Sequence, residues 1–124
     1  MIRDCEDSMT RGTLIGAGKT RDVYVGPSGL VIKVSRPGLS KVNWCEWALW
    51  NTCPEIREWL APVRGISPTF RTLLMDRGKR APIIPSPLPD WIIDANLDNW
   101  ISLRGKIVLC DYGHLPMARR IFGP

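Results

Sequence analysis

Three polar side chains near the C-terminal end of the chain, Asp94, Asn99 and Asp111, are the residues best suited to do chemistry. They belong to a stretch, Trp91 to His114, that reads as an apolar extended run, a polar loop, a turn at Arg104-Gly105 and a returning strand. This pattern predicts a β-hairpin that gathers the three side chains at one end. Carboxylate and amide oxygens suit Mg²⁺, which usually keeps waters and substrate phosphates in its coordination shell. The stretch therefore indicates a site for a divalent cation and a phosphate, the alternative being a polar turn.

Two further charges lie in surroundings where a charge needs an explanation. Lys33 is embedded in the β-branched strand 30–34, and Glu46 is the only acid between residues 23 and 54. Glu46 lies in the middle of a predicted helix, among tryptophans and a cysteine. Burying an unpaired charge is very costly. The alternative is that Lys33 extends to solvent from an edge strand and Glu46 faces water.

A glycine-containing segment, Gly16-Ala17-Gly18, separates the first two predicted strands. Glycines let a backbone approach phosphates closely enough for N–H groups to donate to them. The segment is followed by a strand and not by a helix, which distinguishes it from a dinucleotide-binding unit. An ordinary hairpin turn is the alternative interpretation.

Taken in order, these motifs resemble those of the protein-kinase-like family across residues 13 to 113. The matching segments are Gly16-Ala17-Gly18 with Val23 for the Gly-rich loop, Val31-Ile32-Lys33 for the lysine strand, Asp94-x4-Asn99 for the catalytic loop, and Asp111-Tyr112-Gly113 for Asp-Phe-Gly.

The resemblance implies an ATP–Mg²⁺ site and a role for each matching residue. Lys33, paired with Glu46, would reach the phosphates, and Asp94 would orient the acceptor hydroxyl. Asn99 and Asp111 would be the metal ligands. The expected catalytic set is therefore Lys33, Glu46, Asp94, Asn99 and Asp111, and the expected nucleotide-binding set is Gly16, Ala17, Gly18, Lys33, Met75, Asp76 and Arg77, with Met75 guarding the adenine pocket.

The chain also departs from the family pattern. Arg21 stands at the third glycine position, which we expect to make the loop less pliable. Ile92-Ile93 replaces the His-Arg pair before Asp94, and Asn96 stands where protein kinases usually carry a lysine. Only a short connector precedes the catalytic-type loop, and no activation segment follows Gly113.

The elements that position these residues predict an α+β fold. We expect a kinase N-lobe-like five-stranded antiparallel sheet with one main helix, plus the β-hairpin, with the helical C-lobe largely absent. The expected strands span 13–15, 23–25, 30–34, 61–63 and 70–75, with a turn at 64–68, a helix at 41–52, helical turns at 55–60 and a Pro-rich linker at 82–89. Residues 1–12 would be an arm and 13–124 a single minimal domain.

Length and composition limit the possible domain number, partners and cellular compartment of the chain. A length of 124 residues suits one domain, and no apolar run approaches the ~20 residues of a membrane helix. The net charge of +5 comes from scattered basic residues, so nucleic acid is an unlikely partner. Four cysteines without a C-x-x-C pair and a single histidine argue against structural zinc and fit reduced thiols in the cytoplasm. The six tryptophans suggest that part of the surface is a protein–protein interface, for example that of a homodimer.

Two functions follow as hypotheses. The first is phosphoryl transfer from ATP–Mg²⁺ to a Ser/Thr hydroxyl of a protein substrate. The second is a catalytically degenerate kinase-like scaffold that binds a partner protein and inhibits or redirects it. A compact chain of the second kind would suit a phage or mobile-element protein acting in the host cytoplasm.

Overall fold

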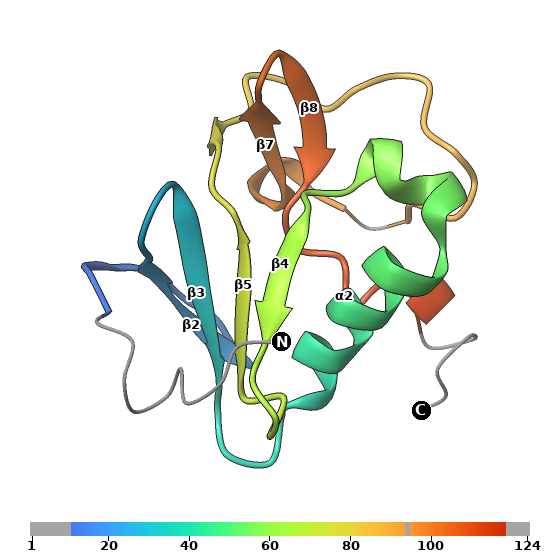
Figure 1. Ribbon diagram of the computed structural model, residues 1–124. Helices are drawn as coiled ribbons and strands as arrows, with labels where there is room; N and C mark the ends of the chain where they lie inside the picture. The colour runs from blue at the N-terminus through green and yellow to red at the C-terminus, as the bar shows by residue number, and fades with distance from the viewer. Residues whose placement is uncertain (1–10, 94, 119–124) are drawn as a thin grey trace.

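Two antiparallel sheets and one long helix make up the part of the chain that the computed structural model describes, residues 11–93 and 95–118 (Figure 1). The larger sheet has five strands in the order β1-β2-β3-β5-β4. Its strands are β1 (Leu14–Ala17), β2 (Arg21–Val25), β3 (Leu30–Ser35), β4 (Val63–Ile66) and β5 (Thr72–Asp76). The predicted α+β class, with a five-stranded antiparallel sheet, one main helix and a hairpin, is confirmed.

Strand β3 is the centre of the larger sheet because it pairs with β2 on one side and with β5 on the other. Val31 to Ser35 are all buried, which agrees with the β-branched run in the sequence. The turn before β3 has positive φ at Ser28 and Gly29, +53° and +76°. Two such residues in succession match the right-handed twist of the strands that they join.

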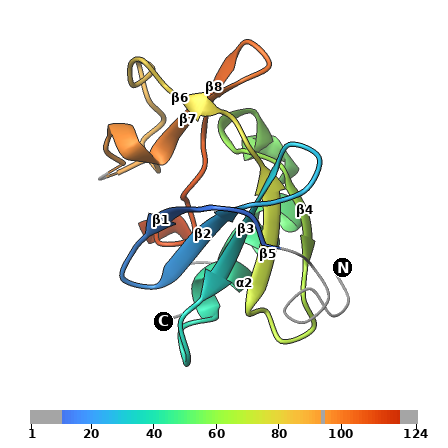
Figure 2. The same cartoon turned by 90° about the vertical axis from the view of Figure 1, so that its left-hand side faces the viewer.

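Helix α2 (Lys41–Thr52) begins and ends where the sequence predicts and packs against one face of the larger sheet (Figures 1 and 2). Ser40 is the N-cap residue, although its side chain makes no capping hydrogen bond. The helix buries Cys45, Ala48 and Leu49 together with two polar residues, Asn43 and Glu46. A 3₁₀ helix, η1 (Pro54–Trp59), follows it.

The second sheet has the order β6-β7-β8 and stands beyond the end of the larger one (Figure 2). Strands β7 (Trp100–Leu103) and β8 (Lys106–Leu109) form the predicted hairpin, with a turn at Arg104 and Gly105, after the short 3₁₀ helix η2 (Leu97–Asn99). Residues 79 and 80 were not among the expected strands, but they form β6 (Lys79–Arg80) and pair with β7.

One hydrophobic core joins the two sheets. Trp100, Leu109 and Tyr112 from the C-terminal part lie in the same buried cluster as Leu60 and Met75. The segment after β8 is held there because the Tyr112 hydroxyl donates to the Ala61 carbonyl at 2.9 Å and the Ala61 N–H donates to the Leu109 carbonyl at 2.8 Å. The position of the Asp111-Tyr112-Gly113 segment is therefore fixed by the core.

Two boundaries differ from the sequence prediction. Residues 64 to 66, expected in a turn, belong to β4, which pairs with β5 through a register shift between Val63 and Gly65. Gly16 and Ala17, also expected in a turn, lie in β1, opposite Val23 and Asp22. Both errors arise because strand pairing extends further than local turn signals indicate. No described helix has the length and apolar character needed to cross a membrane.

Candidate functional site

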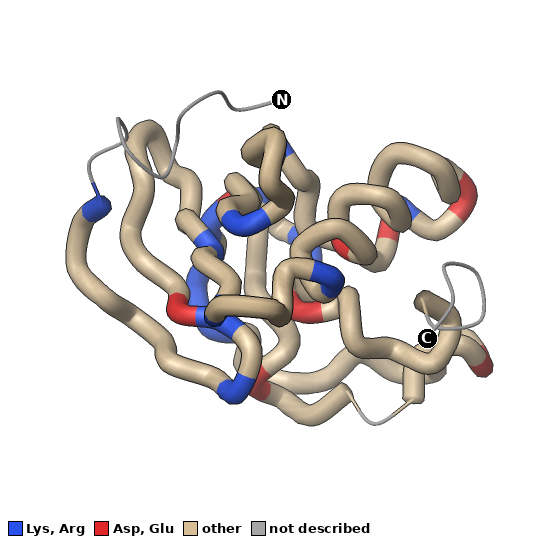
Figure 3. Tube along the Cα trace, turned by 90° about the horizontal axis from the view of Figure 1, so that it is seen from below, with Lys and Arg blue, Asp and Glu red and all other residues tan. Residues whose placement is uncertain are grey.

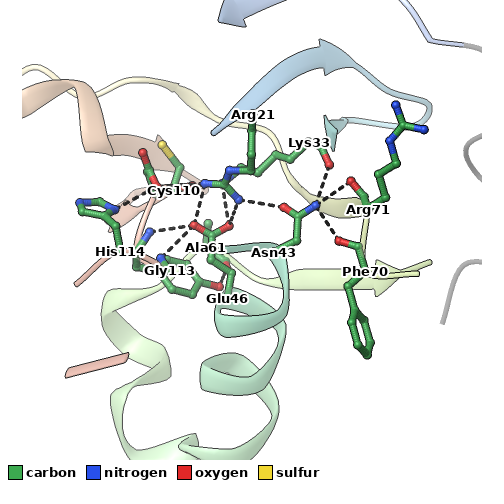
Figure 4. Close-up of polar contacts among 12 residues, drawn as sticks. Arg21, Lys33, Asn43, Glu46, Ala61, Phe70, Arg71, Cys110, Gly113 and His114 are labelled. Atoms are coloured by element: carbon green, nitrogen blue, oxygen red, sulfur yellow. Dashed lines mark hydrogen bonds and ion pairs between the residues drawn. The ribbon is translucent and has the colours of Figure 1, made fainter. Parts of the chain in front are cut away.

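The buried carboxylate of Glu46 is the centre of the candidate site (Figure 4). It lies on α2, has no solvent exposure, and accepts hydrogen bonds from four residues on three different segments. The donors are Arg21 Nη1 (2.7 Å) and Nη2 (2.9 Å), Lys33 Nζ (3.0 Å), the Tyr112 N–H (2.9 Å) and the Gly113 N–H (3.1 Å). Both carboxylate oxygens are thus fully used within the chain.

These donors keep Glu46 ionised. Burial by itself would raise the pKa of its carboxyl group, but the charges of Arg21 and Lys33 outweigh that effect and hold the pKa below its usual value. A buried carboxylate survives only when it is paired and hydrogen-bonded in this way. Figure 3 shows Lys or Arg positions beside Asp or Glu positions in the middle of the chain trace.

Lys33 makes the contact that the resemblance implied. Its Nζ lies 3.0 Å from Glu46 Oε1, and its side chain is 5% exposed. The same ammonium also donates to the backbone carbonyl of Cys110, the residue before Asp111. Lys33 therefore connects β3 to α2 and to the segment after β8, and its catalytic role stays a prediction.

Arg21 is the site residue whose role the sequence analysis missed. Its guanidinium is 6% exposed and contacts Glu46 through two nitrogens, and it also donates to Asp111 Oδ1 at 2.9 Å and to Asn43 Oδ1 at 3.1 Å. The predicted strand began only at Val23, but β2 begins two residues earlier, at Arg21, and Val23 pairs with Lys33. Side chains two apart on a strand share a face, so Arg21 had to face α2.

Asn43 is the second residue that sequence reasoning missed. It is fully buried one helical turn before Glu46. Its amide nitrogen lies within hydrogen-bonding distance of the carbonyls of Lys33 (3.2 Å), Phe70 (3.0 Å) and Arg71 (2.8 Å). Asn43 thereby ties α2 to β3 and to the turn before β5, which fixes the helix position that Glu46 needs.

Asp111 lies next to this centre and is paired with the Arg21 guanidinium and the His114 imidazole. Its Oδ1 accepts from Arg21 and lies 3.2 Å from His114 Nδ1, while its side chain remains 43% exposed. Partial burial favours the neutral acid, but the hydrogen bond with His114 and the charges of Lys33 and Arg21 outweigh it and hold the pKa well below 3.8. The hydrogen bond with Asp111 in turn raises the pKa of His114 above 6.5.

Of the two remaining residues of the predicted catalytic set, the structure describes Asn99 but not Asp94. Asn99 ends η2, and its carbonyl accepts from the Cys110 N–H at 2.8 Å, so Asn99 and Asp111 lie on neighbouring segments. Asp94 lies outside the described residues, and its predicted role is unchanged by the structure.

The predicted phosphate-binding turn contains fewer of the segment's residues than expected. With Gly16 and Ala17 in β1, the turn is closed by a hydrogen bond from the Gly18 N–H to the Arg21 carbonyl at 2.8 Å. The Gly18 carbonyl accepts from Arg36 Nε at 3.0 Å. A Cβ at Gly16 or Gly18 would meet only ordinary contacts, at 3.7 Å and 3.6 Å. The fold itself does not require glycine at either position.

The three residues predicted to hold adenine follow one another at the end of β5. Met75 is fully buried. The N–H of Asp76 donates to the Pro62 carbonyl at 3.0 Å, and the N–H of Arg77 donates to the Gly29 carbonyl at 2.9 Å. In this conformation neither N–H is available to a nucleotide.

This arrangement does not fit the ATP–Mg²⁺ group that the resemblance implies. The metal would need the Asp111 carboxylate, whose Oδ1 is bonded to Arg21 and His114. The phosphates would need the Lys33 ammonium, which, besides its expected contact with Glu46, also donates to the Cys110 carbonyl. The buried guanidinium of Arg21 supplies the positive charge that would otherwise come from a metal.

Neither models of known protein families nor curated proteins match the chain. The functional interpretation therefore depends on the residues and their geometry.

Proposed function

We propose that the chain is a catalytically degenerate kinase-like scaffold that binds a partner protein and inhibits or redirects it. The observation that carries this proposal is the contact of one guanidinium, that of Arg21, with both Glu46 and Asp111. Those two carboxylates are the acids that a kinase-like site would use to position its lysine and its metal.

The charge balance of the site supports the proposal. Two buried cations, Arg21 and Lys33, face the two carboxylates of Glu46 and Asp111. A metal entering this set would have to displace Arg21 from Asp111 or lie close to a fixed positive charge. Repulsion between like charges is strong at such a short distance and low effective dielectric. The network is thus complete without a nucleotide.

Exposed apolar side chains support the binding of a protein. Ile83, Ile84 and Ile93 are 63%, 37% and 46% exposed, and they lie in the connector between β6 and η2. This connector stands where the resemblance would place the start of a helical lobe. Apolar side chains left exposed in one region are typical of protein-binding surfaces. The partner would be a cytoplasmic protein, in a host cell if the chain is phage-encoded.

Thermal unfolding with and without millimolar Mg²⁺–ATP tests the nucleotide half of the proposal. We expect the wild-type midpoint to stay unchanged. A ligand present at ~100 times its Kd would stabilise the fold by about 2.7 kcal/mol, which raises the midpoint of a domain of this size by several degrees. Such a rise, if it vanished in Asp111→Ala, would overturn the proposal.

Complex formation tests the protein-binding half. The chain is used to capture proteins from the cytoplasm of its source cell, and each captured protein is then purified and mixed with it. Light scattering after size exclusion should give a defined complex that forms without nucleotide and with Lys33→Met as well. A complex that needs Mg²⁺–ATP, or a chain that associates only with itself, would contradict the scaffold function.

Phosphoryl transfer to a protein Ser/Thr hydroxyl is the competing proposal. The Lys33–Glu46 contact and the partial exposure of Asp111 favour it. Transfer of labelled phosphate from ATP to a captured partner, lost in both Asp94→Asn and Asp111→Ala, would establish it. Equal labelling with the wild type and these variants would point to a contaminating kinase.

A further inference from the structure

A basic cleft lies between the two sheets, away from the Glu46 centre. Its volume is about 1250 Å³, and it is lined by the β2–β3 turn, β4, the segment from the end of β5 through β6, and the end of the β7–β8 hairpin. Figures 1 and 2 show that β5 leads into the second sheet at this end of the molecule. None of the residues around Glu46 lines the cleft.

Positive charge dominates the lining of this cleft. Five of its residues are cationic, and a single acid faces them. The cations are Arg64, Arg77, Lys79, Arg80 and Arg104, and the acid is Asp76. Arg80 also pairs with Asp98 outside the cleft, at 2.6 Å, but both of these side chains are about three-quarters exposed, and such pairs are weak. The cleft thus retains an excess of positive charge.

Two of the arginines are held in place before any ligand arrives. The Asp76 carboxylate is 6% exposed, and it accepts from Arg64 Nε at 2.7 Å, Arg64 Nη2 at 2.8 Å and Arg104 Nη2 at 2.8 Å. The hydrogen bond from Arg64 is the largest cause that lowers the pKa of Asp76. The arginine side chains themselves remain 51% and 65% exposed. Side chains oriented in advance lose less entropy when they bind an anion.

Arg104 stands at a position that does not favour arginine. It has a φ of +48° in the hairpin turn, followed by Gly105 at +81°. Turns with two positive φ values prefer Asn-Gly because a larger side chain is strained there. The arginine therefore adds its charge to the cleft at a cost to the turn.

The lining distinguishes between classes of anionic partner. No aromatic side chain lines the cleft, whereas single-stranded nucleic acids are usually held by stacking on aromatic rings. Arginine forks match carboxylates in geometry. β6 is an edge strand of its sheet, so an extended peptide could pair with it. Leu30 and Leu103 add apolar surface beside the charges.

We propose that the basic cleft binds an extended, carboxylate-rich segment of the partner protein. This inference rests on the proposed scaffold function, because it names the surface and the chemistry of the partner.

Fluorescence anisotropy at physiological ionic strength tests the cleft without knowledge of the partner. The probe is a fluorescein-labelled peptide of alternating Glu and Thr, compared with a Lys-Thr peptide and with an oligothymidylate of the same length. We expect saturable binding of the Glu-Thr peptide only. The double substitution Lys79→Glu with Arg80→Glu should weaken it by about tenfold or more, because like charges would then face each other.

The matched control makes the same change of charge away from the cleft, with Arg71→Glu just before β5 and Lys41→Glu at the start of α2, both at exposed positions. Binding should then change little. The cleft assignment fails if the wild type does not bind the peptide saturably, if both double variants lose binding equally, or if the oligothymidylate binds more tightly. Should Lys79→Glu with Arg80→Glu not fold, the exposed Arg77→Glu alone makes the same test.

The two proposals can fail separately. A purified partner that binds the wild type and the Lys79→Glu, Arg80→Glu variant equally well would leave the scaffold function standing and remove the cleft from it. Peptide binding in the cleft, together with an Asp111-dependent rise of the thermal midpoint by Mg²⁺–ATP, would leave the cleft as a binding site and remove the scaffold function.

Discussion

Arg21 and Glu46 form a two-pronged ion pair, in which Nη1 lies 2.7 Å from Oε1 and Nη2 lies 2.9 Å from Oε2. The pair joins β2 to α2, and both side chains are buried. Replacing a whole buried ion pair by apolar residues can be nearly neutral, whereas removing one partner leaves a buried charge uncompensated. The stability of the fold should therefore be sensitive to the loss of any single member of the network.

Glu46→Gln should destabilise the protein by about 3–5 kcal/mol, since Arg21 and Lys33 would lose the charge that compensates them. Urea unfolding followed by circular dichroism measures the change in the free energy of unfolding. The matched control is Glu58→Gln, at an exposed position of η1, which should change stability by no more than about 0.5 kcal/mol.

A companion variant separates charge from packing. Combining Glu46→Leu with Arg21→Met and Lys33→Met removes the three charges of Glu46, Arg21 and Lys33 at once, and it should recover much of the stability lost in Glu46→Gln. If Glu46→Gln and Glu58→Gln unfold at the same urea concentration, the network does not contribute to stability as we infer.

The pairing of Asp111 with His114 predicts a pH dependence. The folded-state pKa of His114 is raised above 6.5, mainly by the hydrogen bond with Asp111. The folded state therefore binds the proton more tightly, so the stability from this pair is complete below pH 6.5 and is lost as the pH rises through the folded pKa. Because the sequence contains one histidine, a single ring resonance in an NMR titration reports this pKa directly.

The control for the histidine titration is Asp111→Asn. It should bring the pKa of His114 back toward 6.5, because the neutral amide cannot stabilise the imidazolium by charge. His114→Gln should remove the corresponding part of the stability change above pH 6.5. A His114 pKa at or below 6.5 in the wild type would show that the pair does not form in solution.

Gly113→Ala should destabilise the protein by about 1–3 kcal/mol through overpacking. An added Cβ would lie 2.5 Å from the Val42 carbonyl oxygen and 2.8 Å from Glu46 Cγ, and backbone cannot move aside cheaply. Gly16→Ala is the control, since its Cβ would meet Val23 at an ordinary 3.7 Å. The measurement compares the thermal midpoints of the Gly113→Ala and Gly16→Ala variants. Equal midpoints would mean that α2 and the segment at Gly113 are less tightly packed than described.

Local signals predicted much of the fold. The turn at Arg104-Gly105 and the β-branched run at 30–34 predicted the strands that the structure contains there, and the bounds of α2 were correct. The Lys33–Glu46 contact could also be anticipated, because each charge lay in apolar surroundings that demanded a partner.

The remaining features depend on contacts between distant segments. Arg21 and Asp111 are 90 positions apart, so nothing local to Arg21 revealed its second partner. Lys79 and Arg80 form a strand only because β7 lies beside them. Residues 64 to 66 continue β4 through a register shift that the glycine at position 65 made look like a turn.

The donors to Glu46 also constrain the order of events during synthesis. Arg21 and Lys33 leave the ribosome before Glu46, but the N–H groups of Tyr112 and Gly113 come 66 and 67 residues after it. A nascent chain that ends before Asp111 must hold its helix against the sheet with this carboxylate only partly bonded. The network should therefore close late, and a chain cut before that point should be handled by the cell as incompletely folded.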